Sequence, residues 1–430
     1  MTRFIAVLTA LAALVVPAAA SAGIFGTDPL NISVSPNGAA ANGDSGAPAV
    51  SGDNRKGRLA AFQSDASNLV GGDSNDVTDV FVWFRPRGGE GLSLRRGAGS
   101  LQRVSVGPGG REANGASRAP SLDGSITKSP HCVAFESDAS NLAAGDGDSV
   151  TDVFVRDLRA NRTFLVSRGI SAPATQPSID GACSKVAFSA SGRVLITPVK
   201  GGRGRVLGSG SNADFSLDGT AVTWQKGRGI ALSRNGKQSM VAASGQNPTV
   251  SDGERLHGQS SASYGVSFET RSALSGRDHN PGFDMYMRVL GGSGGPRDTD
   301  LISAPGRGAG SLGGDNYNGG ITAYAPNRGI LLFAHTEGES TDLYYRNNNS
   351  GNIDDLAHSA AVDALGGINE VRTSARANFV AFSSAYSGDL SQPFGGIRGR
   401  SRGGILPSLE SLFSGHRNVY FKHLVDGDRL

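Results

Sequence analysis

One nineteen-residue segment occurs twice in this sequence with almost no change. Residues 64–82 read SDASNLVGGDSNDVTDVFV, and residues 137–155 read SDASNLAAGDGDSVTDVFV. Each copy follows a short apolar run, crosses a polar turn and enters a run rich in β-branched and aromatic residues. A strand, a structured turn and a second strand form the middle of a four-stranded blade, and repeats of this kind are typical of a β-propeller. The chain is therefore expected to be built from copies of one unit.

The number of units follows from the apolar second strand, which carries one aromatic residue in each copy. A turn signal precedes each aromatic, most clearly SGDN at 51–54 and LDGS at 122–125. The content of 63 glycines and 18 prolines suits many tight turns between short strands. We predict an all-β fold, a seven-bladed β-propeller of four-stranded antiparallel blades, with six or eight blades as the alternatives. The aromatic marks are Phe62, Phe135, Phe188, Trp224, Phe268, Phe333 and Phe382.

The two ends of the repeat region resemble different strands of one blade. LNISVS at 30–35 matches LQRVSV at 101–106, the last strand of the first full copy, whereas NVYFKHL at 418–424 resembles the third strand, DVFVRDL at 152–158. The N-terminal strand is therefore predicted to complete the last blade, which would hide the edge strands that an open array leaves. We expect a single propeller domain over residues 30–430, preceded by a short tail at 23–29.

The first 22 residues have the features of a secretory signal peptide. Arg3 provides a positive charge, residues 4–16 are apolar, and Ala20-Ser21-Ala22 supplies small residues before the expected cleavage point. The apolar run is shorter than the roughly 20 residues of a membrane helix, and no later stretch is apolar enough to cross a bilayer. The protein is predicted to be secreted or periplasmic.

The net charge of the mature chain is small. Removal of Arg3 lowers it from +3 to +2, which gives no support for a nucleic-acid partner, and we expect a monomer.

Cys132 and Cys183 lie near the start of the corresponding strand in successive units, and an exported protein meets an oxidising environment. A Cys132–Cys183 disulfide is expected, with two free thiols as the alternative.

The repeat also suggests a family. The run F-x-S-D-A-S-N-L with the following D-V-F-V, preceded by P-S-x-D-G and followed by R-V-S-V, resembles the TolB-like, WD-type propeller repeat of bacterial exported proteins. The resemblance covers roughly residues 30–428 and is strongest in the first, second and seventh units. It implies a non-catalytic scaffold, or the non-catalytic propeller of a larger enzyme.

An oxygen-rich pattern, Asp-x-Asn/Asp followed by a further Asp, occurs in three of the polar turns. Carboxylate and amide oxygens at this spacing can supply ligands to Ca²⁺, a hard cation that takes six to eight oxygens. The alternative is structural: the first two residues form Asx turns and the last carboxylate binds backbone N–H groups before the strand. The candidate ligands are Asp73, Asn75 and Asp79; Asp146, Asp148 and Asp152; and Asp278, Asn280 and Asp284.

Motifs for catalysis are weak in this sequence. GDSGAP at 43–48 resembles the nucleophile segment of trypsin-like proteases, but no histidine precedes it, as those enzymes require. The seven histidines form no H-x-H or H-E-x-x-H pair, so a zinc site has no support. No catalytic residues and no resident cofactor other than possible calcium are predicted.

The insertion at 391–415 differs from the other loops in composition. Three arginines precede an apolar patch, so the segment is a candidate for docking a partner, with a flap packed on the blade edge as the alternative. The residues expected to contact a partner are Arg398, Arg400, Arg402, Leu409 and Phe413.

Together these features predict a non-catalytic, exported interaction scaffold. Its ligand would be a protein or a polysaccharide of the cell envelope. The alternative is a hydrolase or lyase with its site on the loop face or in the central channel.

Overall fold

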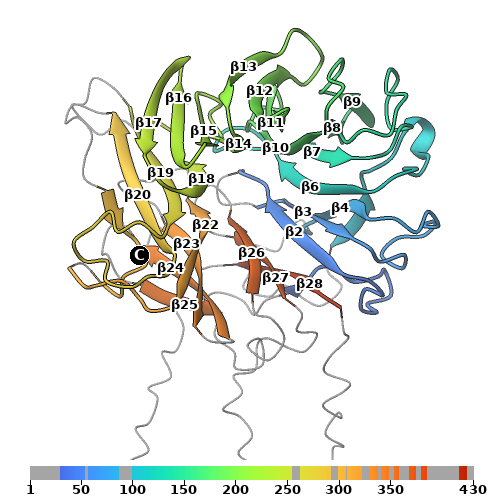
Figure 1. Cartoon of the computed structure of the whole chain (residues 1–430). Helices are drawn as coiled ribbons and strands as arrows, with labels where there is room; N and C mark the ends of the chain where they lie inside the picture. Colours follow the sequence, from blue (N-terminus) through green and yellow to red (C-terminus); the bar gives the residue numbers. More distant parts are fainter. Residues whose placement is uncertain are drawn as a thin grey trace, which may run out of the picture.

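The computed structural model describes residues 30–423, except for several gaps. These described residues form seven four-stranded antiparallel sheets arranged around a central axis (Figure 1). The prediction of a seven-bladed β-propeller is therefore confirmed. The gaps are 54–56, 87–98, 254–261, 292–298, 307, 322–329, 338–339, 348–352, 358–367, 374–378 and 385–415.

Each blade consists of consecutive strands, numbered from the axis outward, except the last. Blade 1 contains β2 (Ser45–Val50), β3 (Leu59–Ser64), β4 (Asp79–Phe84) and β5 (Ser100–Arg103). Blade 2 contains β6 (Ser117–Leu122), β7 (Cys132–Ser137), β8 (Asp152–Asp157) and β9 (Arg162–Leu165). Blade 3 contains β10 (Ala174–Ile179), β11 (Lys185–Ala190), β12 (Arg193–Pro198) and β13 (Arg205–Ser209). Blade 4 contains β14 (Ser211–Phe215), β15 (Ala221–Lys226), β16 (Gly229–Arg234) and β17 (Lys237–Ala242).

The remaining three blades follow the same pattern and close the ring. Blade 5 contains β18 (Gln246–Val250), β19 (Ser263–Thr270), β20 (Asp284–Gly291) and β21 (Thr299–Leu301). Blade 6 contains β22 (Asp315–Ile321), β23 (Ile330–Glu337), β24 (Ser340–Asn347) and β25 (Ile353–Ala357). Blade 7 contains β26 (Ile368–Thr373), β27 (Phe379–Ser384), β28 (Asn418–His423) and, as its fourth strand, β1 (Leu30–Asn31).

The ends of the propeller meet in blade 7, as the repeat pattern predicts. Leu30 pairs with Phe421 and Asn31 with Tyr420 in antiparallel register. The regular pairing is shorter than the predicted strand at 30–35, but Ile32 N donates to the carbonyl oxygen of Val419 at 2.9 Å and extends it. The innermost strand of blade 1 also contacts that of blade 7, so the sheet edges are covered and the disc is closed.

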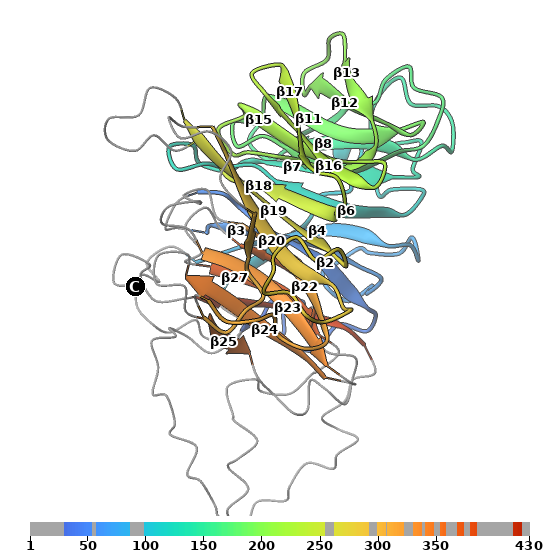
Figure 2. The same cartoon turned by 60° about the vertical axis from the view of Figure 1, so that its left-hand side comes forward.

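Neighbouring sheets face one another around the ring (Figure 2), and the buried apolar side chains lie between them. The apolar clusters each combine residues of two adjacent blades. The seven aromatic marks of the second strands are all fully buried, and burying one such side chain stabilises the fold by about 2 kcal/mol. In five blades the mark stacks on a third-strand aromatic, with ring centroids 5.6–6.2 Å apart; the pairs are Phe62–Phe81, Phe135–Phe154, Phe268–Tyr286, Phe333–Tyr344 and Phe382–Tyr420.

The two ends of the central channel differ. At one end the turns between first and second strands hydrogen-bond to one another: Gly52 N donates to Asp123 O, Gly124 N to Gly181 O, and Gly181 N to Leu217 O. A Cβ at Gly181 would lie 2.4 Å from the carbonyl oxygens of Gly124 and Leu217, so the close approach requires glycine there. The backbones of these turns in blades 1 to 4 therefore lie close together at this end.

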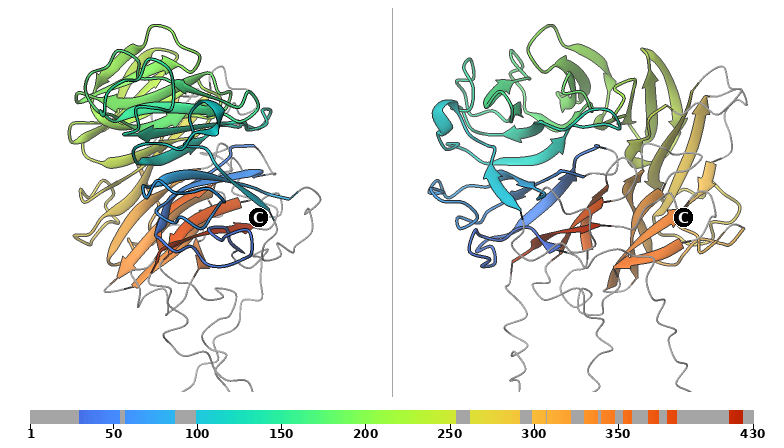
Figure 3. Two further views of the ribbon diagram at one scale, coloured as in Figure 1. Left: turned by 90° about the vertical axis from the view of Figure 1, so that its right-hand side faces the viewer. Right: turned by 180° about the vertical axis from the view of Figure 1, so that it is seen from behind.

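The opposite end carries the long loops. Strands alternate in direction, so the loops from second to third strands and the connections between blades all emerge on one side of the disc, which we call the loop face (Figure 3). It includes residues 65–78, 138–151 and 271–283. No helix among the described residues has the length and apolarity needed to cross a bilayer.

Candidate functional site

The three oxygen-rich turns lie on the loop face, and each ends at the first residue of a third strand. Asp79 begins β4, Asp152 begins β8 and Asp284 begins β20. None of these three residues is more than 7% exposed to solvent. A carboxylate buried to this extent needs hydrogen-bond donors or a nearby positive charge, since leaving it unpaired is costly.

A serine hydroxyl contacts each of these three carboxylates. In every case the serine lies two residues after the fourth strand of the same blade, and it links the carboxylate to the backbone N–H that follows it. The hydroxyls of Ser105, Ser167 and Ser303 donate to Asp79, Asp152 and Asp284, respectively. The same serines accept from Val80 N, Val153 N and Met285 N at 3.0, 2.9 and 3.1 Å. This relay anchors the third strand to the fourth.

Blade 7 repeats the relay across the chain ends. Val419 N donates to Ser33 Oγ at 2.9 Å, and Ser33 Oγ donates to Asn418 Oδ1 at 3.3 Å. Ser33 again lies two residues after the fourth strand, and Asn418 is the first residue of the third. The closure of the ring therefore uses the side-chain contact that blades 1, 2 and 5 use internally.

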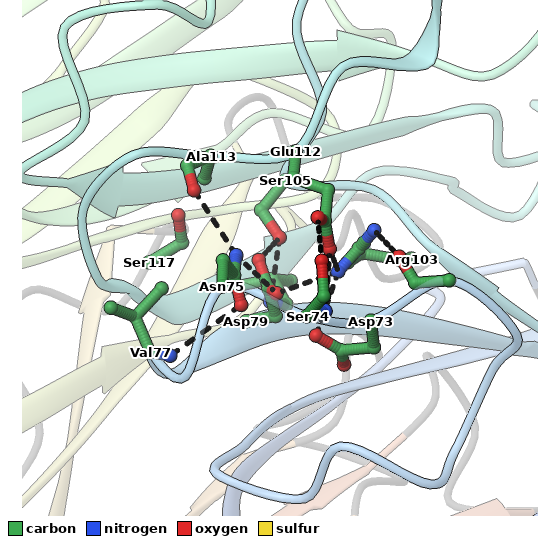
Figure 4. Close-up of polar contacts among 12 residues, drawn as sticks. Asp73, Ser74, Asn75, Val77, Asp79, Arg103, Ser105, Glu112, Ala113 and Ser117 are labelled. Carbon is green, nitrogen blue, oxygen red and sulfur yellow. Dashed lines mark hydrogen bonds and ion pairs between the residues drawn. The ribbon is translucent and has the colours of Figure 1, made fainter.

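In blade 1 an arginine supplies the positive charge (Figure 4). Arg103 Nη1 lies 2.9 Å from Asp73 Oδ1, 3.1 Å from Asp79 Oδ2 and 2.7 Å from Glu112 Oε1, and only 8% of the Arg103 side chain is exposed. Asn75 Nδ2 also donates to Asp79 Oδ2, at 3.0 Å. Burial raises the pKa of Asp73 to about 6, and the guanidinium opposes this shift. Hydrogen bonds from Ser74, followed by the arginine, lower the pKa of Glu112 to about 2.

In blade 5 a phenol and two amides replace the arginine. Tyr286 OH donates to Asp278 Oδ2 at 2.5 Å, while Asn280 and Asn316 donate to Asp284 at 3.0 and 3.2 Å. Burial, together with the neighbouring Asp278, raises the pKa of Asp284 to about 7. Hydroxyl and amide donors therefore take the place of the arginine in blade 5.

In blade 2 neither an arginine nor a phenol with amides occupies the corresponding positions. Leu165 occupies the position of Arg103, Phe154 that of Tyr286, and Asp148 that of Asn75. One carboxylate oxygen from each of Asp146, Asp148 and Asp152 lies within 4.8 Å of the others. Burial, and next the charge of Asp152, raises the pKa of Asp146 to about 6. Among the described residues, Ser167 is the only hydrogen-bond donor to Asp152.

The role of each predicted residue thus depends on its position in the Asp-x-Asn/Asp motif. The middle residue forms an Asx turn in all three loops, because Asn75, Asp148 and Asn280 accept from the backbone N–H two residues later. The last residue takes part in the serine relay rather than binding several backbone N–H groups. The sequence patterns did not identify Arg103, Glu112 or Tyr286 as partners; the R-V-S-V segment at 103–106 was the available signal for the arginine and the serine.

A second group of polar residues lines the channel where it opens on the loop face. Each first strand has a bulge here, and in blades 3 and 6 the bulge N–H donates to a glutamate of the preceding blade: Gln176 N to Glu136 Oε2 at 2.7 Å, and Asn318 N to Glu269 Oε2 at 2.6 Å. Arg118 also binds Glu136, at 3.1 Å. The acids at this opening are therefore engaged by neighbouring blades.

Beside this opening lies an exposed cluster formed by Arg271, Phe283 and Tyr317, which we call the aromatic–arginine cluster. The Arg271 guanidinium lies over the Phe283 ring at 4.4 Å, and Phe283 packs on Tyr317 with centroids 5.8 Å apart. The Arg271 side chain is 57% exposed, Tyr317 is 37% exposed, and Leu274 in the same loop is 36% exposed. The docking residues predicted in the insertion, namely Arg398, Arg400, Arg402, Leu409 and Phe413, lie outside the described residues.

The two cysteines are joined in the structure. Cys132 and Cys183 form a disulfide with Cα atoms 5.9 Å apart, which links blade 2 to the turn that precedes β11 in blade 3. Asp123, which is fully buried, accepts from His131 N and Cys132 N at 2.8 Å each, so this end of β7 is fixed from two sides.

The fold and its repeated loop place the chain in the class of seven-bladed β-propellers. No family model and no curated protein matches the sequence. Similar solved structures include the β-propeller domain of the Trilobed protease from Pyrococcus furiosus, at 11% identity and a TM-score of 0.45 over 80% of this chain and 89% of that chain. They also include TolB from Acinetobacter baumannii (13%, 0.33, 60% and 54%) and the dihydro-heme d1 dehydrogenase NirN (10%, 0.42, 78% and 61%). These likenesses concern the fold alone.

Proposed function

We propose that this protein is an exported, non-catalytic binding module that holds a protein of the cell envelope on its loop face. The predicted signal peptide at 1–22, outside the described residues, supports export to the periplasm or beyond. The resemblance to TolB-like repeats of bacterial exported proteins supports the same assignment. The module acts as a monomer in this proposal.

The observation that carries the proposal is the aromatic–arginine cluster. Tyrosine and arginine are enriched at protein interfaces, where they supply large contact areas and several hydrogen bonds from rigid groups. Arg271 is held over Phe283 and beside Asp315, at 3.5 Å, so its side chain is oriented before a partner arrives. The exposed Leu274 adds apolar area next to it.

The state of the acids at the channel opening favours binding over hydrolysis or lyase chemistry. An enzyme at this place needs two titratable groups that are free to act on a substrate. Glu269 is 1% exposed and accepts from Gln246, Asn247 and Asn318, and Glu136 is bound by Arg118 and Gln176 N. These carboxylates hold the blades together.

Site-specific photo-crosslinking tests the proposal. A photoreactive residue at Leu274 is expected to form adducts with an envelope protein, whereas the same residue at Met240, which is 50% exposed on the outer strand β17, forms none. The double variant Arg271→Ala, Tyr317→Ala should lose the adduct, since hot-spot residues cost at least ~2 kcal/mol of binding when truncated. Equal adducts from both positions, or binding of purified envelope polysaccharide without any protein adduct, would reject a protein partner at this cluster.

A further inference from the structure

The acidic turn of blade 5 forms the same internal hydrogen bonds as that of blade 1. Asn280 Nδ2 donates to Asp284 Oδ2 at 3.0 Å and to a carbonyl oxygen of the next connection at 2.6 Å. Asn75 Nδ2 donates to Asp79 Oδ2 at 3.0 Å and to the equivalent carbonyl oxygen at 3.1 Å. Equivalent positions in the two turns can therefore be assigned: Asp278 corresponds to Asp73, Leu301 to Arg103 and Ser311 to Glu112.

In blade 1 a cation lies between the first and the last carboxylate of the turn. Arg103 Nη1 lies 2.9 Å from Asp73 Oδ1 and 3.1 Å from Asp79 Oδ2. Leu301 takes the place of this arginine in blade 5, and it is both uncharged and shorter. Within the described part of the chain, the side chains that donate to the two blade 5 carboxylates are hydroxyls and amides, which carry no charge.

One oxygen of the blade 5 pair is buried without a partner. Asp278 is 8% exposed, and Tyr286 OH donates to its Oδ2 at 2.5 Å. Its Oδ1 is also buried but has no hydrogen-bond partner among the residues that the structure describes. The same atom in blade 1, Asp73 Oδ1, accepts from the arginine. An unsatisfied buried carboxylate oxygen is costly, so it indicates a positive group that the chain itself does not supply.

The acidic turns of blades 1 and 2 lack this feature. Among the described residues, neither turn contains a buried carboxylate oxygen without a partner. The missing partner is therefore specific to blade 5 and does not follow from the Asp-rich motif alone.

Two further oxygens surround the position that the guanidinium occupies in blade 1. Glu112 Oε1 lies 2.7 Å from Arg103 Nη1, and the carbonyl oxygen of Gly72 accepts from Nη2 at 3.0 Å. In blade 5 the Ser311 hydroxyl and the carbonyl oxygen of Arg277 stand at these two places. Ser311 is partly exposed, so water can reach this side of the turn.

We propose that blade 5 binds one Ca²⁺ ion between Asp278 Oδ1 and Asp284 Oδ2, where blade 1 holds its guanidinium. Oxygen donors and two negative charges suit a hard divalent cation, and water completes the six to eight ligands that Ca²⁺ takes. The ion satisfies the buried oxygen and neutralises two carboxylates that have only uncharged donors. Blade 1 does not bind the ion, because its own arginine occupies the equivalent position.

Calorimetric titration and thermal unfolding at about pH 8 test the proposal. At this pH a proton on Asp284, whose pKa is raised to about 7, competes little with the metal. Titration of the EDTA-treated and dialysed chain with CaCl₂ should show one site. Calcium at about 100 times its Kd should raise Tm by about 4 °C over the value in EDTA, and MgCl₂ should raise it less, since Mg²⁺ requires stricter octahedral geometry. If a shared proton satisfies the two carboxyls instead, Tm is the same in calcium and EDTA and no binding heat appears, which overturns the proposal.

The variant Asp278→Asn locates the site. Its amide can donate to Asp284 in place of the ion, so it should keep the β-sheet circular dichroism spectrum and abolish the response to calcium. Asp73→Asn and Asp146→Asn change the same motif position in blades 1 and 2, and these matched controls should bind calcium with the Kd of the unmodified chain. If Asp278→Asn does not fold, Leu301→Arg takes its place, because it supplies the internal cation of blade 1 and should likewise abolish binding. Calcium binding that persists in a folded blade 5 variant, or that disappears in a folded control, refutes the assignment.

Discussion

Blades 1 and 2 contain nearly the same acidic turn but stabilise its buried carboxylate differently. In blade 1, Arg103 lies among Asp73, Asp79 and Glu112 at 2.7–3.1 Å. In blade 2, Leu165 replaces the arginine, and three carboxylates lie together with one serine donor to Asp152. The difference shows that the serine relay and the buried aspartate are the constant part of the loop. The compensating charge is the part that varies from blade to blade.

The two blades also differ in how they are joined to the next blade. Blade 2 is covalently linked to blade 3 through Cys132–Cys183. Blade 1 contacts blade 2 through a shared apolar cluster and hydrogen bonds such as Ala119 N to Gln63 Oε1, at 3.0 Å. The disulfide therefore lies in the same blade as the acidic cluster that lacks an internal cation.

Removal of the disulfide is expected to have the largest effect on stability. The cross-link closes a loop of 51 residues, for which chain entropy predicts a loss of about 4 kcal/mol in the free energy of unfolding of the double variant Cys132→Ala, Cys183→Ala. Denaturant titration of the oxidised chain and the variant measures this loss. A reducing agent should lower the stability of the unmodified chain and leave that of the variant unchanged. A loss below about 1 kcal/mol would mean that packing alone holds blades 2 and 3 together.

The substitution Arg103→Leu converts the blade 1 cluster into that of blade 2. It leaves Asp73, Asp79 and Glu112 without their cation, and removing one partner of a buried ion pair costs about 3 kcal/mol or more. Lowering the pH to 5 should recover part of this loss, since protonation removes the repulsion between the carboxyls. Arg111→Leu, at an exposed position of the same connection, is the control and should stay within about 0.5 kcal/mol of the unmodified chain. Equal stabilities for the two variants would show that the ion pairs contribute nothing.

Loss of the relay hydroxyl at the ring closure should have an intermediate effect. Ser33→Ala removes the group between Val419 N and Asn418 Oδ1, both in buried residues, and an unsatisfied buried polar group costs about 2 kcal/mol. Hydrogen exchange measured by mass spectrometry should become faster in β28 of Ser33→Ala. The comparison variant is Ser105→Ala, in which exchange in β4 should increase less, because Arg103 and Asn75 still bind Asp79 there. Equal increases in the two strands would show that the closing strand does not depend on this relay.

Sequence periodicity was sufficient for the architecture and insufficient for the site. The aromatic marks from Phe62 to Phe382 identified every blade, because a second strand buried on both faces keeps its aromatic whatever the loop lengths are. The match between residues 30–35 and the segment containing Arg103 identified the closing strand. Both inferences depend on regular backbone pairing, which leaves a pattern in the sequence.

The side-chain partners of the acidic turns leave no such pattern. Arg103 binds Asp73 across 30 residues, and Tyr286 reaches Asp278 from a strand position where the other copies have phenylalanine. These contacts depend on which side chains the third and fourth strands present to the loop, and that differs between blades with the same turn sequence. The motif therefore predicted where the oxygens gather, while only the structure shows which of them are already satisfied.

The smallest predicted effect is a difference in pH dependence between the unmodified chain and Asp148→Asn. Burial and neighbouring charges raise the pKa of Asp146 to about 6 and raise that of Asp152, so the folded state binds more protons than the unfolded state above pH 4. Stability from this cluster is therefore present below the unfolded pKa and is lost as the pH rises through about 6. Asp284 and Asp252, whose pKa values are raised to about 7, act in the same direction in both proteins and cancel in the difference.

The comparison is measured by denaturant titration in EDTA at pH 4.5 and at pH 7. At pH 4.5 the stabilities of the two proteins should differ less, because Asp146, whose pKa is raised to about 6, is then largely protonated and the repulsion within the cluster is weaker. At pH 7 the variant should be more stable by about 1 kcal/mol, since the introduced amide donates to Asp152 and one repelling charge is gone. Part of the cluster is exposed to solvent, which keeps the figure small. A stability difference that does not change between the two pH values would mean that the blade 2 carboxylates do not interact, and the contrast with blade 1 would then be one of packing rather than of charge.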